Sequence, residues 1–258
     1  MEFHAASDLD LLIVLDDRRT VVSDESAEAL FNQVWQRVDV ATQGDARPKA
    51  GGVFSQCVSW RALTDSTVRG IVNEDVTTFG QRMQLILDAQ PLLHQKSFDD
   101  LQAELLNWYL ETRVSQLFEE AGPFSWLRQD VQRYWRSIWS RAYWLHEDHA
   151  EKSIEVNVKL RSSRAAIMAA FLYAVDAAQR TGGDTSDAVA ALQERLTTTP
   201  LERLTAQLSA ADSSELLSSY QTVWQFLANR NPADNLLPRE IRTTLKTLLR
   251  WLPNSVTE

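Results

Sequence analysis

Apolar residues recur with a period close to 3.6 from Asp75 to the end of this chain, which is typical of amphipathic helices. Phe79, Met83 and Ile86 share one side of a first helix, which Pro91 ends. Gly and Pro number only 8 and 7 in 258 residues, about half their usual share. So few tight turns argue against a sandwich or a barrel. Further helices are predicted over residues 97–121, 127–145, 154–180, 186–196, 200–208, 213–228 and 238–252.

The first ninety residues have a different pattern, in which strand-like and helix-like segments alternate. Residues 9–15 form a nearly continuous apolar run, as in a strand buried on both faces. A helix follows from the N-cap Ser23, and further strands are predicted over residues 38–41 and 53–59. We therefore expect an α+β domain over residues 1–90. An all-helical domain is expected over residues 91–258.

Charge and cysteine content narrow the classes of protein that this chain can belong to. It has 26 Lys and Arg against 35 Asp and Glu, a net charge of −9, which disfavours coating of nucleic acid through bulk charge but leaves room for a local basic site. The single cysteine, Cys57, excludes a disulfide framework and a cysteine-based zinc site. The sequence has neither a signal peptide nor an apolar run of about 18 residues, so a soluble cytoplasmic protein without membrane contact is predicted.

Two carboxylates stand at the start of the first predicted strand. Asp8 and Asp10 are two residues apart, so in a strand they point to the same face and can share a cation. Carboxylate oxygens suit Mg²⁺, which prefers one or two carboxylates together with substrate phosphates and water. The alternative interpretation is a solvated strand end. Spacing alone leaves both open.

Asp39 is a third candidate carboxylate, flanked by Val38 and Val40 in the second predicted strand. Neighbouring elements in the sequence usually neighbour one another in a sheet, which would bring Asp39 close to the first strand. A carboxylate in a buried strand needs a metal or an ion-pair partner. Arg37, Arg47 and Lys49 are the candidate partners.

These residues resemble those of the DNA polymerase beta-type nucleotidyltransferases, specifically the bacterial proteins that join a minimal nucleotidyltransferase domain to a helical C-terminal region. The resemblance is carried by the run SDLDLLIV at residues 7–14 and by VDV at 38–40. Later segments also look similar: PKAGGVF at 48–54, TFGQRM at 78–83, RYWR at 133–136 and NVKLRSSR at 157–164. The resemblance implies a mixed sheet flanked by helices, with Mg²⁺ or Mn²⁺ held by Asp8, Asp10 and Asp39.

The implied reaction is transfer of a nucleoside monophosphate from an NTP to a hydroxyl of RNA, protein or a small molecule. In this family two metal ions clamp the triphosphate and stabilise the departing pyrophosphate. Asp39 would hold the acceptor-side metal or take the hydroxyl proton. The helical domain would select the acceptor.

Several residues are candidates for contacting the nucleotide. Ser7 adjoins the acidic pair, and Lys49 lies beside Gly51 and Gly52 in a predicted loop. Lys159, Arg161 and Arg164 could reach phosphates from the helical domain, because residues three apart share a helix face. The alternative for these basic residues is an ordinary solvated surface.

Two other functions remain open. The family places a Gly-Ser pair at a helix start ahead of the acidic pair, whereas only MEFHAA precedes Ser7 here. A start further upstream, a truncated copy or a catalytically silent protein that binds a partner, as in toxin–antitoxin pairs, would each account for this. Arg141 and His146 also match the Arg-x4-His spacing of the HEPN ribonucleases, a spacing that arises easily by chance.

Overall fold

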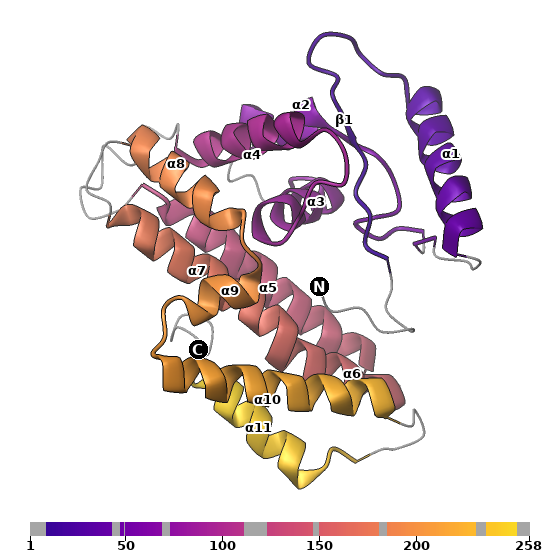
Figure 1. Ribbon diagram of the computed structural model, residues 1–258. Coiled ribbons are helices and arrows are strands. Elements are labelled where there is room, and N and C mark those ends of the chain that lie inside the picture. The colour runs from indigo at the N-terminus through magenta and orange to yellow at the C-terminus, as the bar shows by residue number, and fades with distance from the viewer. Residues whose placement is uncertain are drawn as a thin grey trace. The chain divides into compact units, whose positions relative to one another are not determined.

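The computed structural model describes residues 9–42, 47–48, 50–68, 73–110, 123–146, 150–180, 185–230 and 236–251, and the structural statements below concern these residues. Helices make up most of the described chain (Figure 1). The chain divides into two compact units, Met1–Trp108 and Tyr109–Glu258.

The first unit combines a two-stranded parallel sheet with helices. Val14 pairs with Val58 and Leu15 with Ser59, and the connection between the two strands passes through helix α1. The predicted mixed sheet is thus replaced, in the described residues, by one short parallel pair. The elements are β1 (Val14–Leu15), α1 (Asp24–Thr42), β2 (Val58–Ser59), α2 (Trp60–Leu63), a 3₁₀ turn (Ser66–Val68), α3 (Val76–Leu87) and α4 (Gln95–Leu110).

Helix α1 corrects the prediction of a strand over residues 38–41. The Oγ of Ser23 accepts a hydrogen bond from the Ser26 N–H at 3.3 Å, and the helix then runs without interruption to Thr42. Phe31 and Trp35 are buried at i, i+4, and Val38 continues their stripe as a half-buried residue. The alternation around Asp39 that suggested a strand therefore belongs to the last turns of a helix, because burial of this stripe decides the local structure.

The predicted strands over residues 9–15 and 53–59 are both longer than the observed ones. Only Val14–Leu15 and Val58–Ser59 are strands, with one further bond from the Val58 N–H to the Ile13 carbonyl at 2.9 Å. A turn occupies the start of the second run, where Gly51 has φ +79° and the Ser55 N–H donates to the Gly52 carbonyl. The positive φ at Gly51 favours glycine. The turn closed by the Ser55–Gly52 hydrogen bond continues the loop into the predicted strand.

Helix α3 is the most deeply buried element of the first unit. The Asp75 carboxylate caps it by accepting from the Thr78 N–H at 2.7 Å, and Phe79, Met83 and Ile86 are buried as their spacing predicts. Gly80 lies so close to the 50–58 loop that a Cβ there would be 2.8 Å from a Val53 methyl. The glycine is therefore required by packing, although it lowers helix propensity.

The second unit contains only helices and helical turns as regular elements within its described residues. Its elements are α5 (Ser125–His146), α6 (Ala150–Lys159), a π-helical turn (Leu160–Arg164), α7 (Ala165–Gln179), α8 (Thr185–Leu196), α9 (Pro200–Thr205), α10 (Ala210–Asn229) and α11 (Arg239–Leu249). The helices predicted for this unit are confirmed over their described residues, including 154–160, where alternating apolar residues also allowed a strand. Residues 111–121 of the helix predicted over 97–121 lie outside the described residues. Pro200 opens α9 inside a capping box of Thr199 and Glu202, whereas Pro238 is the N-cap of α11.

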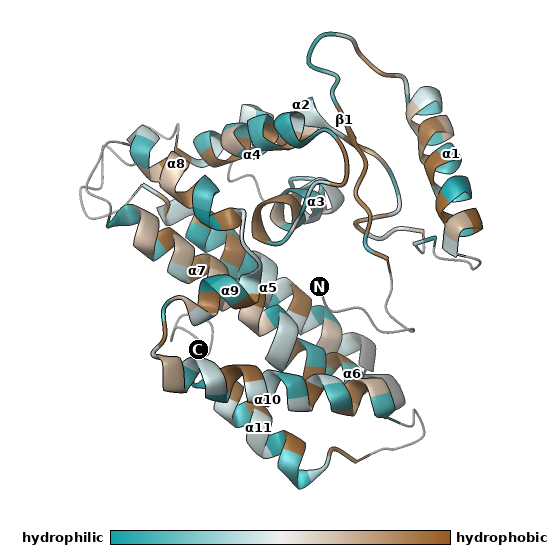
Figure 2. Cartoon of the chain, in the orientation of Figure 1, coloured by the Kyte–Doolittle hydropathy of each residue, from teal (hydrophilic) through white to brown (hydrophobic). Residues whose placement is uncertain are grey.

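Helix α7 forms the centre of the second unit. Ten of its residues are buried, among them Phe171, Leu172 and Val175, and it packs against α8, α9 and the π-helical turn. In Figure 2, by contrast, brown and teal alternate along α10 and α11, each of which buries only three residues. None of the described helices is long and apolar enough to cross a membrane.

Candidate functional site

The candidate site begins at the segment that leads into β1. Asp10 is exposed and lies four residues ahead of Val14 in irregular backbone. Ser7 and Asp8 lie outside the described residues, as does Lys49. The shared face of Asp8 and Asp10 therefore remains a prediction, and Asp10 is accessible from solvent.

Asp39 is half-buried and lies on helix α1, not in the predicted strand. The expected proximity to Asp8 and Asp10 rested on neighbouring strands, but Asp39 belongs to a helix. Of its candidate partners, Arg37 is exposed, and Arg47 contacts the Asn32 side-chain oxygen and lies 5.4 Å over the Phe31 ring. A metal-binding role for Asp39 thus rests on the family resemblance alone.

A metal site is not assembled within the part of the chain that the structure describes, where no three His, Cys, Asp or Glu side chains gather. Asp8 lies outside that part of the chain. The donors that the sequence offers are carboxylate oxygens, and one of them, Asp10, is accessible. This donor chemistry fits Mg²⁺ or Mn²⁺.

Asp17 has a structural role that the sequence did not indicate. Its buried carboxylate follows β1 and accepts hydrogen bonds from the Ser59 Oγ at 2.5 Å and from the Arg61 N–H at 3.1 Å. Ser59 ends β2 and caps α2 by accepting from the Ala62 N–H at 3.1 Å. One carboxylate thus fixes the end of β1 to β2 and to the first turn of α2. Its position after an apolar run was the available signal, but it indicated only a strand end.

The neighbouring carboxylate, Asp16, is exposed and paired with an arginine. The Arg18 guanidinium donates to its two oxygens at 2.8 and 2.7 Å. These hydrogen bonds lower the pKa of Asp16 from 3.8 to about 2. Arg18 also lies 3.6 Å over the Trp60 ring, whose Nε1–H donates to Glu104 at 2.7 Å. Asp16 therefore forms a surface ion pair with Arg18 in the segment that follows β1.

A buried ion pair lies between α3 and the preceding loop. Arg82 is fully buried; its Nη1 is 2.6 Å from the Glu74 carboxylate, and its Nε donates to the Leu63 carbonyl at 2.9 Å. Its guanidinium carbon lies 4.3 Å over the Trp108 ring. Such a group is costly to bury unless its charge is paired. The contacts connect α3 with the end of α2 and with α4, which is a structural function.

The basic residues predicted to bind phosphate lie in the second unit. The Nζ of Lys159 is 2.6 Å from Glu155, and Arg161 lies 5.7 Å over the Trp139 ring. Arg161 and Arg164 are exposed and belong to the π-helical turn, which widens the helix by its i→i+5 bonds. The prediction that they share a face assumed α-helical spacing and therefore loses its geometric basis.

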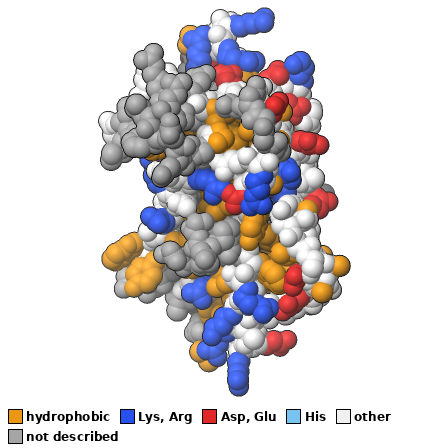
Figure 3. Space-filling model, turned by 90° about the vertical axis from the view of Figure 1, so that its left-hand side faces the viewer, with side chains coloured by type: hydrophobic (Ala, Val, Ile, Leu, Met, Phe, Trp, Pro, Cys, Tyr) orange, Lys and Arg blue, Asp and Glu red, His pale blue; other side chains and the backbone are white. Residues whose placement is uncertain are grey.

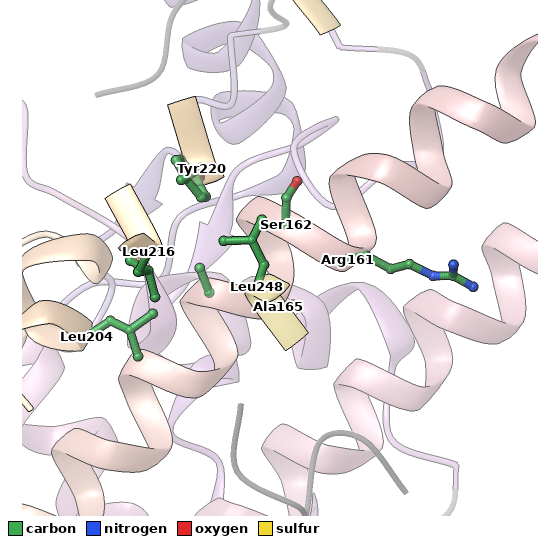
Figure 4. A pocket seen from close by; sticks show the side chains of 8 residues that line it. Arg161, Ser162, Ala165, Leu204, Leu216, Tyr220 and Leu248 are labelled. Atoms are coloured by element: carbon green, nitrogen blue, oxygen red, sulfur yellow. The ribbon is translucent and has the colours of Figure 1, made fainter. Parts of the chain in front are cut away.

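A small pocket adjoins this turn (Figure 4), but its lining is mostly apolar. The figure shows the Arg161 side chain pointing away from the apolar side chains. The Ser162 hydroxyl donates to the Val158 carbonyl at 2.7 Å. Ligand sites combine an apolar wall with a few convergent polar groups, and this one lacks them among the described side chains. The pocket is lined by Arg161, Ser162, Ala165, Ala166, Leu204, Leu216, Tyr220 and Leu248.

The alternative ribonuclease pair is only partly described. Arg141 is exposed on α5, and the side chain of His146 lies outside the described side chains. The Arg-x4-His hypothesis stays a sequence prediction.

Comparison with known proteins adds no relative to these observations. The family resemblance therefore rests on the sequence segments between residues 7 and 164, and the fold rests on the described geometry. No protein-family model, curated protein or solved structure matches this chain.

Proposed function

We propose that this protein is a magnesium-dependent nucleotidyltransferase that moves a nucleoside monophosphate from an NTP to an acceptor hydroxyl. The observation that carries the proposal is the run SDLDLLIV, in which Asp10 is exposed to solvent four residues ahead of Val14, the first residue of β1. The Asp17 carboxylate fixes the other end of that strand, so Asp10 precedes a strand anchored to the rest of the first unit.

In the proposed reaction, Asp8 and Asp10 hold the metal ion and thereby orient the triphosphate. A metal ion held there would supply neutralisation of the phosphate charge and a lower pKa for the acceptor hydroxyl. The hydroxyl oxygen forms a bond to the α-phosphorus, the bond to the bridging oxygen breaks, and pyrophosphate leaves with that electron pair. In this proposal Asp39 accepts the hydroxyl proton. An RNA, a protein or a small molecule would supply the hydroxyl, and the NTP requirement suits a cytoplasmic protein.

Thermal unfolding of the full chain with ATP, GTP, CTP or UTP, each with and without Mg²⁺, tests this proposal. A ligand at a hundred times its dissociation constant adds about 2.7 kcal/mol, which raises Tm by about 5 to 10 °C for a chain of this size. We expect such a rise for at least one NTP, only with Mg²⁺, and its loss in Asp8→Asn/Asp10→Asn.

The matched control is Asp16→Asn, which removes an exposed carboxylate at the other end of β1 and should keep the NTP-dependent rise. If no NTP raises Tm in the presence of Mg²⁺, the chain does not bind the substrate of this reaction. The silent, partner-binding alternative would then be favoured.

A further inference from the structure

Helix α11 has two sharply different faces. Ile241, Leu245 and Leu248 are buried and pack toward α10 and the π-helical turn. At about 100° per residue, these three occupy an arc of about 60° around the helix axis. Residues 239–250 also contain four basic residues, which lie away from the buried stripe within an arc of about 80°. They are Arg239, Arg242, Lys246 and Arg250.

Most of the positive charge on the stripe formed by these four residues is not paired with an acidic side chain. Arg250 is 2.6 Å from the Glu215 carboxylate of α10. Arg239, Arg242 and Lys246 are exposed, and none of them has an acidic partner within the described residues. Glu240, the one acidic residue of α11, lies about 100° around the helix from Arg239.

This local surplus of cations is unlike the chain as a whole, whose net charge is −9. Lys and Arg side chains gather at the lower end of the face in Figure 3, at the level that α11 occupies in Figure 1, with acidic side chains to one side. The eleven steps from Arg239 to Arg250 extend over about 16 Å. A duplex presents one phosphate charge per about 1.7 Å of its axis, so the stripe is long enough to contact several phosphates.

We propose that this basic stripe of α11 is a docking surface for the phosphate backbone of a nucleic acid. Three of its four cations are arginines, whose planar guanidinium groups bind phosphate through paired hydrogen bonds. An anionic membrane is the less suitable partner, because an interfacial helix inserts its apolar face and that of α11 is already buried in the bundle. Backbone binding requires no nucleotidyl transfer, so this proposal stands independently of the proposed function.

The test measures binding of a labelled oligouridylate of about 20 nucleotides to the full chain by fluorescence anisotropy, between about 50 and 200 mM salt. Each phosphate neutralised in a single strand contributes about −0.7 to the slope of log K against log salt. Arg239→Gln/Arg242→Gln/Lys246→Gln should therefore make the slope shallower by about 2. The affinity ratio of the unmodified chain to this variant should grow about 16-fold as salt falls over that fourfold range.

Two further variants separate docking from bulk charge and from folding. Arg19→Gln/Arg37→Gln/Arg136→Gln removes the same charge from three exposed sites on separate segments, and we expect it to keep the slope of the unmodified chain. Arg239→Lys/Arg242→Lys keeps the charge and should keep most of the slope. Three results would each overturn the proposal. The two triple variants could lose the same amount of slope, or the unmodified chain could fail to bind the oligonucleotide at about 50 mM salt. The third is tighter binding to phosphatidylserine vesicles than to RNA.

Discussion

The two compact units are stabilised by different kinds of buried side chain. In the first unit, buried polar groups bond across long stretches of sequence: Asp17 to Ser59, the Gln81 amide to the Val53 carbonyl and Arg82 to the Leu63 carbonyl. In the second unit, apolar residues of α7 pack between helices, and the buried Ser162 bonds within its own helix. The first unit has strands of only two residues, so side chains fix the loops that a longer sheet would hold.

This difference matters because the two kinds of contact fail differently when one residue is changed. Removing one partner of a buried polar contact leaves the other partner without its hydrogen bonds, and that loss adds to the cost of the change. Removing an apolar side chain costs its transfer free energy and the cavity left behind. The first unit should therefore be more sensitive to single polar substitutions, and the second to changes of volume.

The largest effect is expected for Arg82→Met. The substitution keeps the length of the side chain but leaves the Glu74 carboxylate buried without its cation. Breaking a buried ion pair in this way costs about 3 to 5 kcal/mol. Urea-induced unfolding followed by circular dichroism measures the loss.

The matched controls for Arg82→Met are an exposed arginine and the double substitution. Arg37→Met should change the free energy of unfolding by less than about 0.5 kcal/mol. Arg82→Met/Glu74→Leu removes both charges and should recover part of the loss. A double variant as unstable as Arg82→Met would show that the arginine acts through its packing on Trp108 rather than through its charge.

Leu172→Ala tests the apolar side of the comparison. Leu172 is 1% exposed on α7, and truncation of a buried leucine costs about 3 kcal/mol because a cavity remains. The same unfolding measurement applies. Leu217→Ala on α10, where the leucine is 45% exposed, is the control and should cost far less. A small effect for both would mean that α7 is not the centre of this unit.

Asp17→Asn comes next in size and addresses the anchor of β1. The Ser59 hydroxyl and the Arg61 N–H donate to different oxygens of Asp17, so the amide keeps an acceptor for one of them and puts an NH₂ group against the other. Loss of hydrogen bonds to a buried charged group costs about 2 kcal/mol. Asp16→Asn, one residue earlier and exposed, should leave the midpoint of urea unfolding nearly unchanged. Equal midpoints for the two variants would contradict the anchoring role.

The features that the sequence predicted correctly are those encoded by neighbouring residues. The helices after Asp75 follow from a local 3.6 period, so α3 and α5–α11 agree with prediction. Strand pairing is non-local, and the alternation around Asp39 was equally compatible with the last turns of α1. The role of Asp17 depends on Ser59, 42 residues later, which no local pattern reveals. The predicted carboxylate site is only partly described, through Asp10 and Asp39.

The smallest expected effect concerns Asp16, the exposed counterpart of Asp17. Hydrogen bonds from Arg18 lower its pKa from 3.8 to about 2 in the folded chain. Because the folded-state pKa is the lower one, the contact stabilises the fold fully above about pH 3.8, and this contribution is lost as pH falls through about 2. At about pH 3, roughly nine-tenths of the Asp16 carboxyl should be ionised, against roughly one-seventh for an ordinary aspartate. Carboxyl ¹³C shifts report this fraction directly. Arg18→Gln should move the midpoint back toward the ordinary value, and an unchanged midpoint would show that Arg18 is not its cause.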